Sequence, residues 1–95
     1  MASGNIQIIP TEFKETGIPL DTISNLTTLY NGMQSGSYGV ARMASNSTDA
    51  PTTGGGIVFT FKSSGNYGAQ QTLSDAGVYY RKLSGGNWSA WSRIV

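Results

Sequence analysis

The side chains that could perform acid–base chemistry in this chain are few, because histidine and cysteine are both absent. Their absence removes imidazole bases, thiol nucleophiles, disulfides and nearly every transition-metal site. A hydrolase built on this sequence would therefore need a pair of carboxylates. The available acidic residues are Glu12, Glu15, Asp21, Asp49 and Asp75.

Each of these carboxylates has a structural role that is sufficient to explain it. Asp49 and Asp75 lie among Gly, Ser and Pro residues, where Asp commonly bonds its own backbone in a turn. Asp21 precedes a helical pattern and is placed to cap it, and the two glutamates belong to the N-terminal stretch. The run Gly54-Gly55-Gly56 lacks the Gly-Lys-Ser/Thr ending of a phosphate loop. We therefore predict that the chain is not an enzyme and that it uses no metal and no cofactor.

Aromatic rings and amides in the last third of the chain form a second chemical group. We predict a glycan-binding set from rings that stack on sugar C–H faces and amides that bond hydroxyls: Asn66, Tyr67, Tyr80, Asn87 and Trp88. Packing in the core or at a subunit interface is the stronger alternative for each ring, because a thin β core needs large side chains.

Composition limits the other partners of the chain. Its 95 residues suit one domain, and charged residues make up only 12% of them. The net charge of +1 arises from scattered Lys and Arg, so no nucleic-acid partner is predicted. No run approaches the roughly 20 apolar residues of a membrane span, and the first residues lack the basic start and apolar run of a signal peptide, so we expect synthesis in a cytoplasm without one.

Residues 1–20 differ from the rest of the chain. Ile6, Ile8, Ile9 and Phe13 stand in a stretch interrupted by proline, which holds the backbone extended. We predict a docking and oligomerisation arm, because an exposed apolar strand tends to pair with another chain. The alternative is that this stretch is the first strand of the domain's own sheet.

A domain is predicted over residues 21–95, beginning with a short helix. Leu26, Leu29, Tyr30 and Met33 recur at the spacing of one helical face. Ser24 or Asn25 is expected to cap this helix and Gly36 to end it. The apolar stripe is interpreted as core and not as a binding groove.

Strands follow the helix at a spacing of about ten residues, joined by Gly-containing turns, which is typical of a meander. They are predicted over residues 38–44, 57–62, 67–73, 78–83 and 88–95. In the second strand Ile57, Phe59 and Phe61 face one way and Val58, Thr60 and Lys62 the other, a period that indicates a half-buried antiparallel strand. A regular last strand would place Trp88 and Trp91 on opposite faces. The fold class is thus mainly β: a small antiparallel meander or sandwich knob with one short helix and an extended N-terminal arm.

Several motifs from Asp21 to the C-terminus occur together in one order. They are Gly36-Ser37-Tyr38-Gly39-Val40, Asp49-Ala50-Pro51, Gln70-Gln71, Gly77-Val78-Tyr79-Tyr80-Arg81 and Gly86-Asn87-Trp88-Ser89-Ala90-Trp91. In this order the chain resembles the pyocin-knob-like module of phage tail fibres and of phage-derived bacteriocin fibres. Asp49 stands where that pattern has Asn.

The resemblance implies a small β-rich knob, usually trimeric, that helps a particle attach to a cell surface. We therefore expect a virion protein made in the host cytoplasm, a homotrimer that docks on a baseplate, tail or other virion protein through residues 1–20. Host-surface polysaccharide is the expected ligand. The alternatives are a capsid or tail decoration protein and a stand-alone carbohydrate-binding module; such a free lectin would have no use for an arm.

Overall fold

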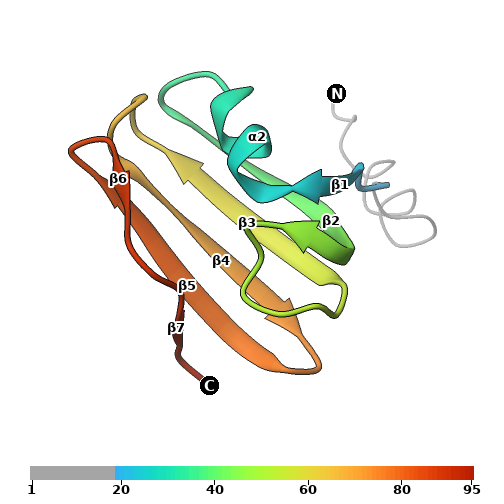
Figure 1. Ribbon diagram of the computed structural model, residues 1–95. Helices are drawn as coiled ribbons and strands as arrows, with labels where there is room; N and C mark the ends of the chain where they lie inside the picture. The colour runs from blue at the N-terminus through green and yellow to red at the C-terminus, as the bar shows by residue number, and fades with distance from the viewer. Residues whose placement is uncertain (1–18) are drawn as a thin grey trace, which may run out of the picture.

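A computed structural model describes residues 19–95 of the chain. These residues form a mainly β domain, with one curled sheet and one short helix (Figure 1). The elements are β1 (Thr22–Asn25), α2 (Leu26–Asn31), β2 (Ser37–Thr48), β3 (Gly56–Lys62), β4 (Gly68–Ser74), β5 (Gly77–Ser84), β6 (Asn87–Trp88) and β7 (Ser92–Arg93). The mainly β fold class with one short helix is confirmed. The greater part of the predicted arm, residues 1–18, lies outside the described residues.

The sheet is built on an antiparallel meander in which β2, β3, β4 and β5 are neighbours in sequence and in space. Gly-rich or Ser-rich turns join them, as the sequence predicts. Both β6 and β7 pair with β5. At the other edge β1 pairs with β2 in parallel, which the sequence pattern does not indicate.

The helix α2 is shorter than its apolar spacing suggests. Asn25 caps it, since the side-chain oxygen of Asn25 accepts a hydrogen bond from Thr28 N at 2.9 Å. Asp21 does not cap the helix, contrary to our expectation, because β1 lies between them. The helix ends at Gly32 and not at Gly36, which has a φ of 77° in the turn before β2.

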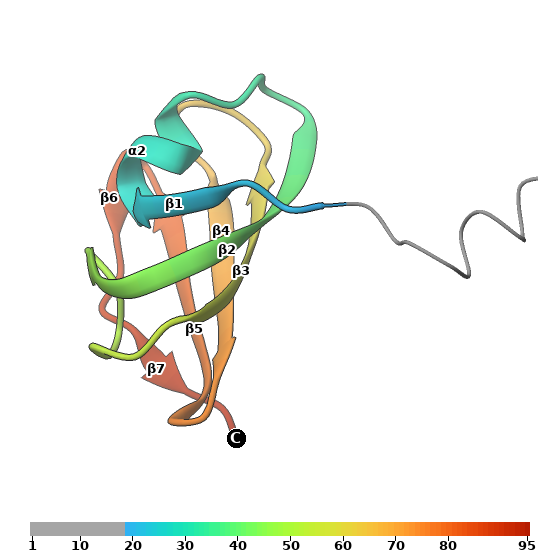
Figure 2. The same ribbon diagram turned by 90° about the vertical axis from the view of Figure 1, so that its right-hand side faces the viewer.

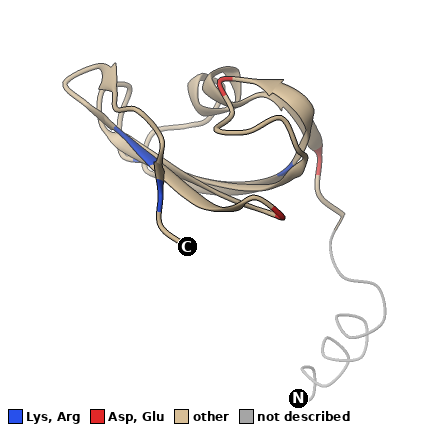
Figure 3. Cartoon of the chain, turned by 60° about the horizontal axis from the view of Figure 1, so that its bottom comes forward, with Lys and Arg blue, Asp and Glu red and all other residues tan. Residues whose placement is uncertain are grey.

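The sheet has an inner face, toward α2, and an outer face. Figures 2 and 3 show α2 and the longer loops on the inner side of the curl, while charged residues are scattered along the ribbon. The inner residues are Gly39, Ala41 and Met43 of β2, Val58, Thr60 and Lys62 of β3, Gly68, Gln70 and Thr72 of β4, and Tyr79, Arg81 and Leu83 of β5. Leu26 of the helix packs with Ala41, Met43 and Val58 in the core.

Two strands differ from the sequence prediction by more than one residue at an end. β2 continues to Thr48, so its second half curls over the inner face and the following loop is shorter than expected. The last strand is broken into β6 and β7, and between them the pairing with β5 shifts by one residue, from Leu83 with Trp88 to Tyr80 with Ser92. Ser89 N donates to Lys82 O at 2.8 Å and Lys82 N donates to Ser89 Oγ at 3.0 Å. Trp88 and Trp91 are therefore not on opposite faces, and both contact Arg81.

Candidate functional site

Two turns meet at one end of the sheet and bring most of the predicted glycan residues close together. Asn66 and Tyr67 lie in the turn between β3 and β4, and Asn87 begins β6. Gly86 N donates to Asn66 O at 3.2 Å, which joins the two turns. Asn66, Tyr67 and Asn87 are all exposed, so their side chains can reach a ligand in solvent.

Trp88 follows Asn87 but lies half-buried against the interior. Its ring meets Tyr30 edge-on, with centroids 5.0 Å apart and planes at 82°. The guanidinium of Arg81 lies 4.0 Å from the Trp88 ring centroid and occupies one face of the ring. A sugar stacked on Trp88 would need the other ring face.

Tyr80 does not belong to the same surface as the other predicted glycan residues. It pairs with Gln71 in the middle of β5 and points from the outer face, whereas Trp88 pairs with Leu83, which is an inner residue. The structure thus brings together Asn66, Tyr67, Asn87 and Trp88 and places Tyr80 across the sheet from them. The arm residues Ile6, Ile8, Ile9 and Phe13 lie outside the described residues.

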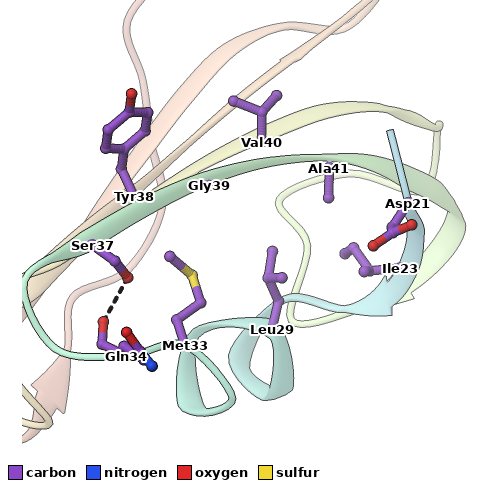
Figure 4. A pocket seen from close by; sticks show the side chains of 10 residues that line it. All are labelled: Asp21, Ile23, Leu29, Met33, Gln34, Ser37, Tyr38, Gly39, Val40 and Ala41. Carbon is purple, nitrogen blue, oxygen red and sulfur yellow. Dashed lines mark hydrogen bonds between the residues drawn. The ribbon is translucent and has the colours of Figure 1, made fainter. Parts of the chain in front are cut away.

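A cleft of about 270 Å³ opens between the β1–α2 segment and the first half of β2 (Figure 4). Ile23, Leu29 and Met33 give it an apolar lining, and Asp21 and Gln34 are among its polar residues. Asp21 is the one carboxylate in it, so the cleft offers no acid–base pair. Sequence reasoning missed this cleft, because it depends on β1 crossing beside β2.

A buried polar network centred on Arg81 is the second feature that the sequence did not predict. Arg81 donates to Gln70 Oε1 from Nε at 3.0 Å and from Nη2 at 2.7 Å, and from Nη2 to Thr27 Oγ1 at 3.0 Å. Gln70 Nε2 in turn donates to Leu26 O at 2.7 Å and to Thr60 Oγ1 at 3.1 Å. The network therefore fastens α2 to the middle of the sheet.

Two tryptophan rings enclose the arginine of this network. The Trp91 ring centroid lies 4.9 Å from the Arg81 guanidinium, on which Trp88 also packs. Trp91 Nε1 donates to Asp49 O at 2.9 Å, which ties the broken last strand to the loop after β2. Burial lowers the pKa of Arg81 from its ordinary value, and the charge of Asp49 opposes that shift.

A second buried cluster joins the C-terminal end of α2 to the turn between β3 and β4. The single hydroxyl proton of Tyr30 is shared between Ser64 O and Tyr67 O, each 2.7 Å from Tyr30 Oη, and burial raises the pKa of Tyr30. Lys62 Nζ donates to three carbonyls at the end of the helix, those of Tyr30 at 3.1 Å, Asn31 at 3.4 Å and Met33 at 2.8 Å. Tyr67 thus has a rigid backbone beneath an exposed side chain, a suitable base for a binding residue.

Comparison with known proteins finds no relative of this chain. No family model matches the chain, and searches of curated proteins and of solved structures find no match.

Within residues 19–95 no three His, Cys, Asp or Glu side chains gather as a metal site would require. In the same range no helix is long and apolar enough to cross a membrane. The arrangement offers exposed amide and phenol groups on a rigid turn pair, which is chemistry for binding.

Proposed function

We propose that this chain is a non-enzymatic structural subunit of a phage-type particle, a knob of a tail fibre or baseplate appendage. In this role it assembles with copies of itself, docks on a tail, baseplate or other virion protein through residues 1–20, and helps the particle attach to host-surface glycans. A homotrimer is the assembly that the family resemblance suggests.

The network around Arg81 is the observation that carries this proposal. The resemblance to the pyocin-knob-like module rests on motifs far apart in the sequence, and four residues from them, Gln70, Arg81, Trp88 and Trp91, meet around one guanidinium. Their convergence supports the interpretation of the motifs as one structural signature.

The placement of the two ends of the domain agrees with such a role. The chain enters the described domain at Pro19, beside β1, and the turns with Asn66 and Asn87 lie at the opposite end of the sheet (Figure 1). A subunit that docks through its N-terminal residues would therefore present these turns away from the particle.

Light scattering of the purified full-length protein tests the assembly part of the proposal. We expect a small oligomer at micromolar concentration, because a subunit of a fibre knob gains rigidity from its neighbours. A monomer over the whole micromolar range would contradict the proposal.

Binding to bacterial surface polysaccharides tests the attachment part. Tyr67→Ala should weaken binding about tenfold, the loss of one stacking contact. Asp75→Ala, in the turn between β4 and β5 at the other end of the sheet, is the control and should bind as the parent does. If Tyr67→Ala and the parent bind equally well, Tyr67 is not part of the glycan site.

A further inference from the structure

The outer face of the sheet carries most of the large apolar side chains of the four strands β2 to β5. Three outward residues on each of four strands form a regular grid, with rows set by the strand register: Tyr38, Phe61, Ala69 and Lys82; Val40, Phe59, Gln71 and Tyr80; Arg42, Ile57, Leu73 and Val78. All but Arg42, Gln71 and Lys82 are apolar or aromatic, and none is acidic. Phe61 is 50% exposed and Tyr38 is 76% exposed, and their rings stack with centroids 6.5 Å apart.

The inner face is more polar than this outer face, although the inner face is the buried one. Thr60, Gln70, Thr72, Lys62 and Arg81 are all buried beneath α2 and the loops. The hydroxyl of Thr72 even lacks a hydrogen-bond partner among the described residues. A free-standing one-sheet domain places its apolar side chains inward and its polar ones toward water. The reversed arrangement indicates that another layer covers the outer face.

No described element supplies that layer. Figures 2 and 3 show α2 and the loops on the inner side, and the outer side of β3 and β4 is bare. We propose that the outer face packs against the outer face of a second copy of this chain, so that the two sheets form a sandwich. The pairing rests on the proposed function only in that both treat the chain as an assembling subunit; its two-fold symmetry requires an even number of copies, in place of the trimer that the resemblance suggests.

The charge pattern of the outer face suits self-pairing. Packed sheets keep their strands within about 30° of each other, so a two-fold axis would run along or across the strands. If the axis runs across the strands, Arg42 faces Tyr38 of the second copy and Lys82 faces Val78 of the second copy. If the axis runs along the strands, Arg42 faces Val78 and Lys82 faces Tyr38. In neither case do two cations meet, and each lies against a ring or an aliphatic side chain on which its stem can pack.

The size of the face also suits a dimer. With strands about 4.8 Å apart and outward residues about 6.7 Å apart along each strand, the grid covers about 19 by 20 Å. Side-chain relief raises the accessible area above this projection of roughly 400 Å², so two faces in full contact would bury about 1,000 Å², near the lower limit for a specific interface, and curvature of the sheet makes this an upper bound. Because the sheet curls, the contact should centre on Phe59 and Gln71 of the middle strands.

Nucleic acid is a weaker candidate for the occupant of this face. Arg42 and Lys82 are the two cations of the grid and lie at opposite corners of it. Typical nucleic-acid sites bring about 6–10 basic contacts to phosphates. The aliphatic side chains Val40, Ile57, Leu73 and Val78 have no use against phosphate and sugar, whereas they pack well against a second sheet.

Sedimentation of the full-length protein tests the pairing. The parent should form dimers, or an even-numbered oligomer built from them. The double variant Val40→Lys/Phe61→Lys should weaken self-association at least about 100-fold while its circular dichroism stays that of the parent. Thr28→Lys adds a cation to the exposed side of α2, away from the face, and should associate as the parent does.

Cross-linking provides a second measurement, because the native chain has no cysteine. Gln71→Cys places one thiol at the centre of the face, where a short bis-maleimide should join two chains. Asp75→Cys, in an exposed turn, should give little covalent dimer at the same concentration.

Three outcomes would overturn the pairing. A trimer that the double variant leaves intact would refute the outer face as the interface while the assembly function stands. A monomer with a freely reactive thiol in Gln71→Cys would refute both proposals. A monomer in which that thiol reacts slowly would mean that residues 1–18 of the same chain cover the face, and would refute the second copy as its occupant.

Discussion

Replacing Gln70 with leucine should be one of the most damaging single substitutions in this domain, although it puts an apolar side chain in a buried position. Gln70 is completely buried, and its amide makes four hydrogen bonds, two of them to the guanidinium of Arg81. Leucine would remove all four and leave a buried charge with fewer partners.

The size of this effect follows from the bonds that are lost. A hydrogen bond to a charged group contributes about 1.5–3 kcal/mol to stability, and the extra apolar surface of leucine offsets part of the loss of two such bonds. A net cost of about 3 kcal/mol results, a large part of the 5–15 kcal/mol that stabilises a typical domain. With a urea m-value of about 1–1.5 kcal/mol/M, the unfolding midpoint should fall by about 2–3 M.

Urea unfolding followed by tryptophan fluorescence is the appropriate assay, because both tryptophans pack on Arg81. Gln71→Leu is the matched control: it is the next residue, it is half-buried on the outer face, and no loss of stability is expected from it. All variants should be compared at one protein concentration, since association also contributes to stability.

A double-mutant cycle separates the Gln70–Arg81 bond from packing. Removing both partners, as Gln70→Leu/Arg81→Met, should cost at least about 1 kcal/mol less than the two single losses added together, because no unpaired charge remains. If the two effects add to within about 0.5 kcal/mol, or if Gln70→Leu is as stable as Gln71→Leu, the network does not stabilise the fold as we argue.

Three further substitutions test other contacts. Tyr30→Phe should lower the free energy of unfolding by about 1–2 kcal/mol, because the hydrogen bond that the hydroxyl shares between two carbonyls is lost. Because burial raises the pKa of Tyr30, its contribution is full below the ordinary tyrosine pKa of about 10 and is lost as the pH rises above it. Urea titrations of the parent should therefore show a loss of stability above pH of about 10 that the variant partly lacks. Lys62→Met should unpair the carbonyls at the end of α2 and cost about 1–2 kcal/mol, with faster hydrogen exchange in the helix than in β4. Gly68→Ala should cost about 2–3 kcal/mol, because its methyl group would collide with the Tyr30 hydroxyl and with Phe61 O, whereas Gly65→Ala has open space and should be neutral in thermal unfolding.

The meander could be predicted from the sequence because its signals are local. Turns rich in Gly, Ser and Asn separate short runs of β-prone residues, and nearest neighbours in sequence then pair. The break after Trp88 could not be predicted in the same way. It depends on Ser89 meeting Lys82 and on Trp91 reaching Asp49 O, contacts between residues 7 and 42 positions apart.

The buried face of the sheet could not be chosen from the sequence either. The alternation in β3 correctly separates Ile57, Phe59 and Phe61 from Val58, Thr60 and Lys62, but a period of two does not say which set is inside. Apolarity would choose the first set. The helix covers the set with Thr60 and Lys62. Lys62 donates a hydrogen bond to a carbonyl at the end of α2, and Thr60 accepts one from the Gln70 amide, which also bonds the first residue of α2.

The glycan-binding set stays a prediction, although the structure brings most of its members close together. The sequence indicates Asn66, Tyr67 and Asn87 by residue type alone, as ring and amide side chains, and the meander brings their turns to one end of the sheet. The partners of Arg81 were not predicted, since they depend on the register that sets Gln70 opposite Arg81 and on the broken last strand.

The reversal of the two faces has a consequence for how this domain is stabilised. The fully buried apolar side chains are few: Leu26, Tyr30, Ala41, Met43, Val58 and Leu83. The rings of Phe61, Tyr38 and Tyr80 are partly exposed on the outer face, so part of their apolar surface does not contribute to the fold of a single chain. Covering them with a second sheet would supply that missing apolar burial, so folding and association would be linked by mass action and the unfolding midpoint would rise with protein concentration. A network that fastens one short helix inside and a broad apolar surface outside thus suit a subunit that becomes rigid when it assembles.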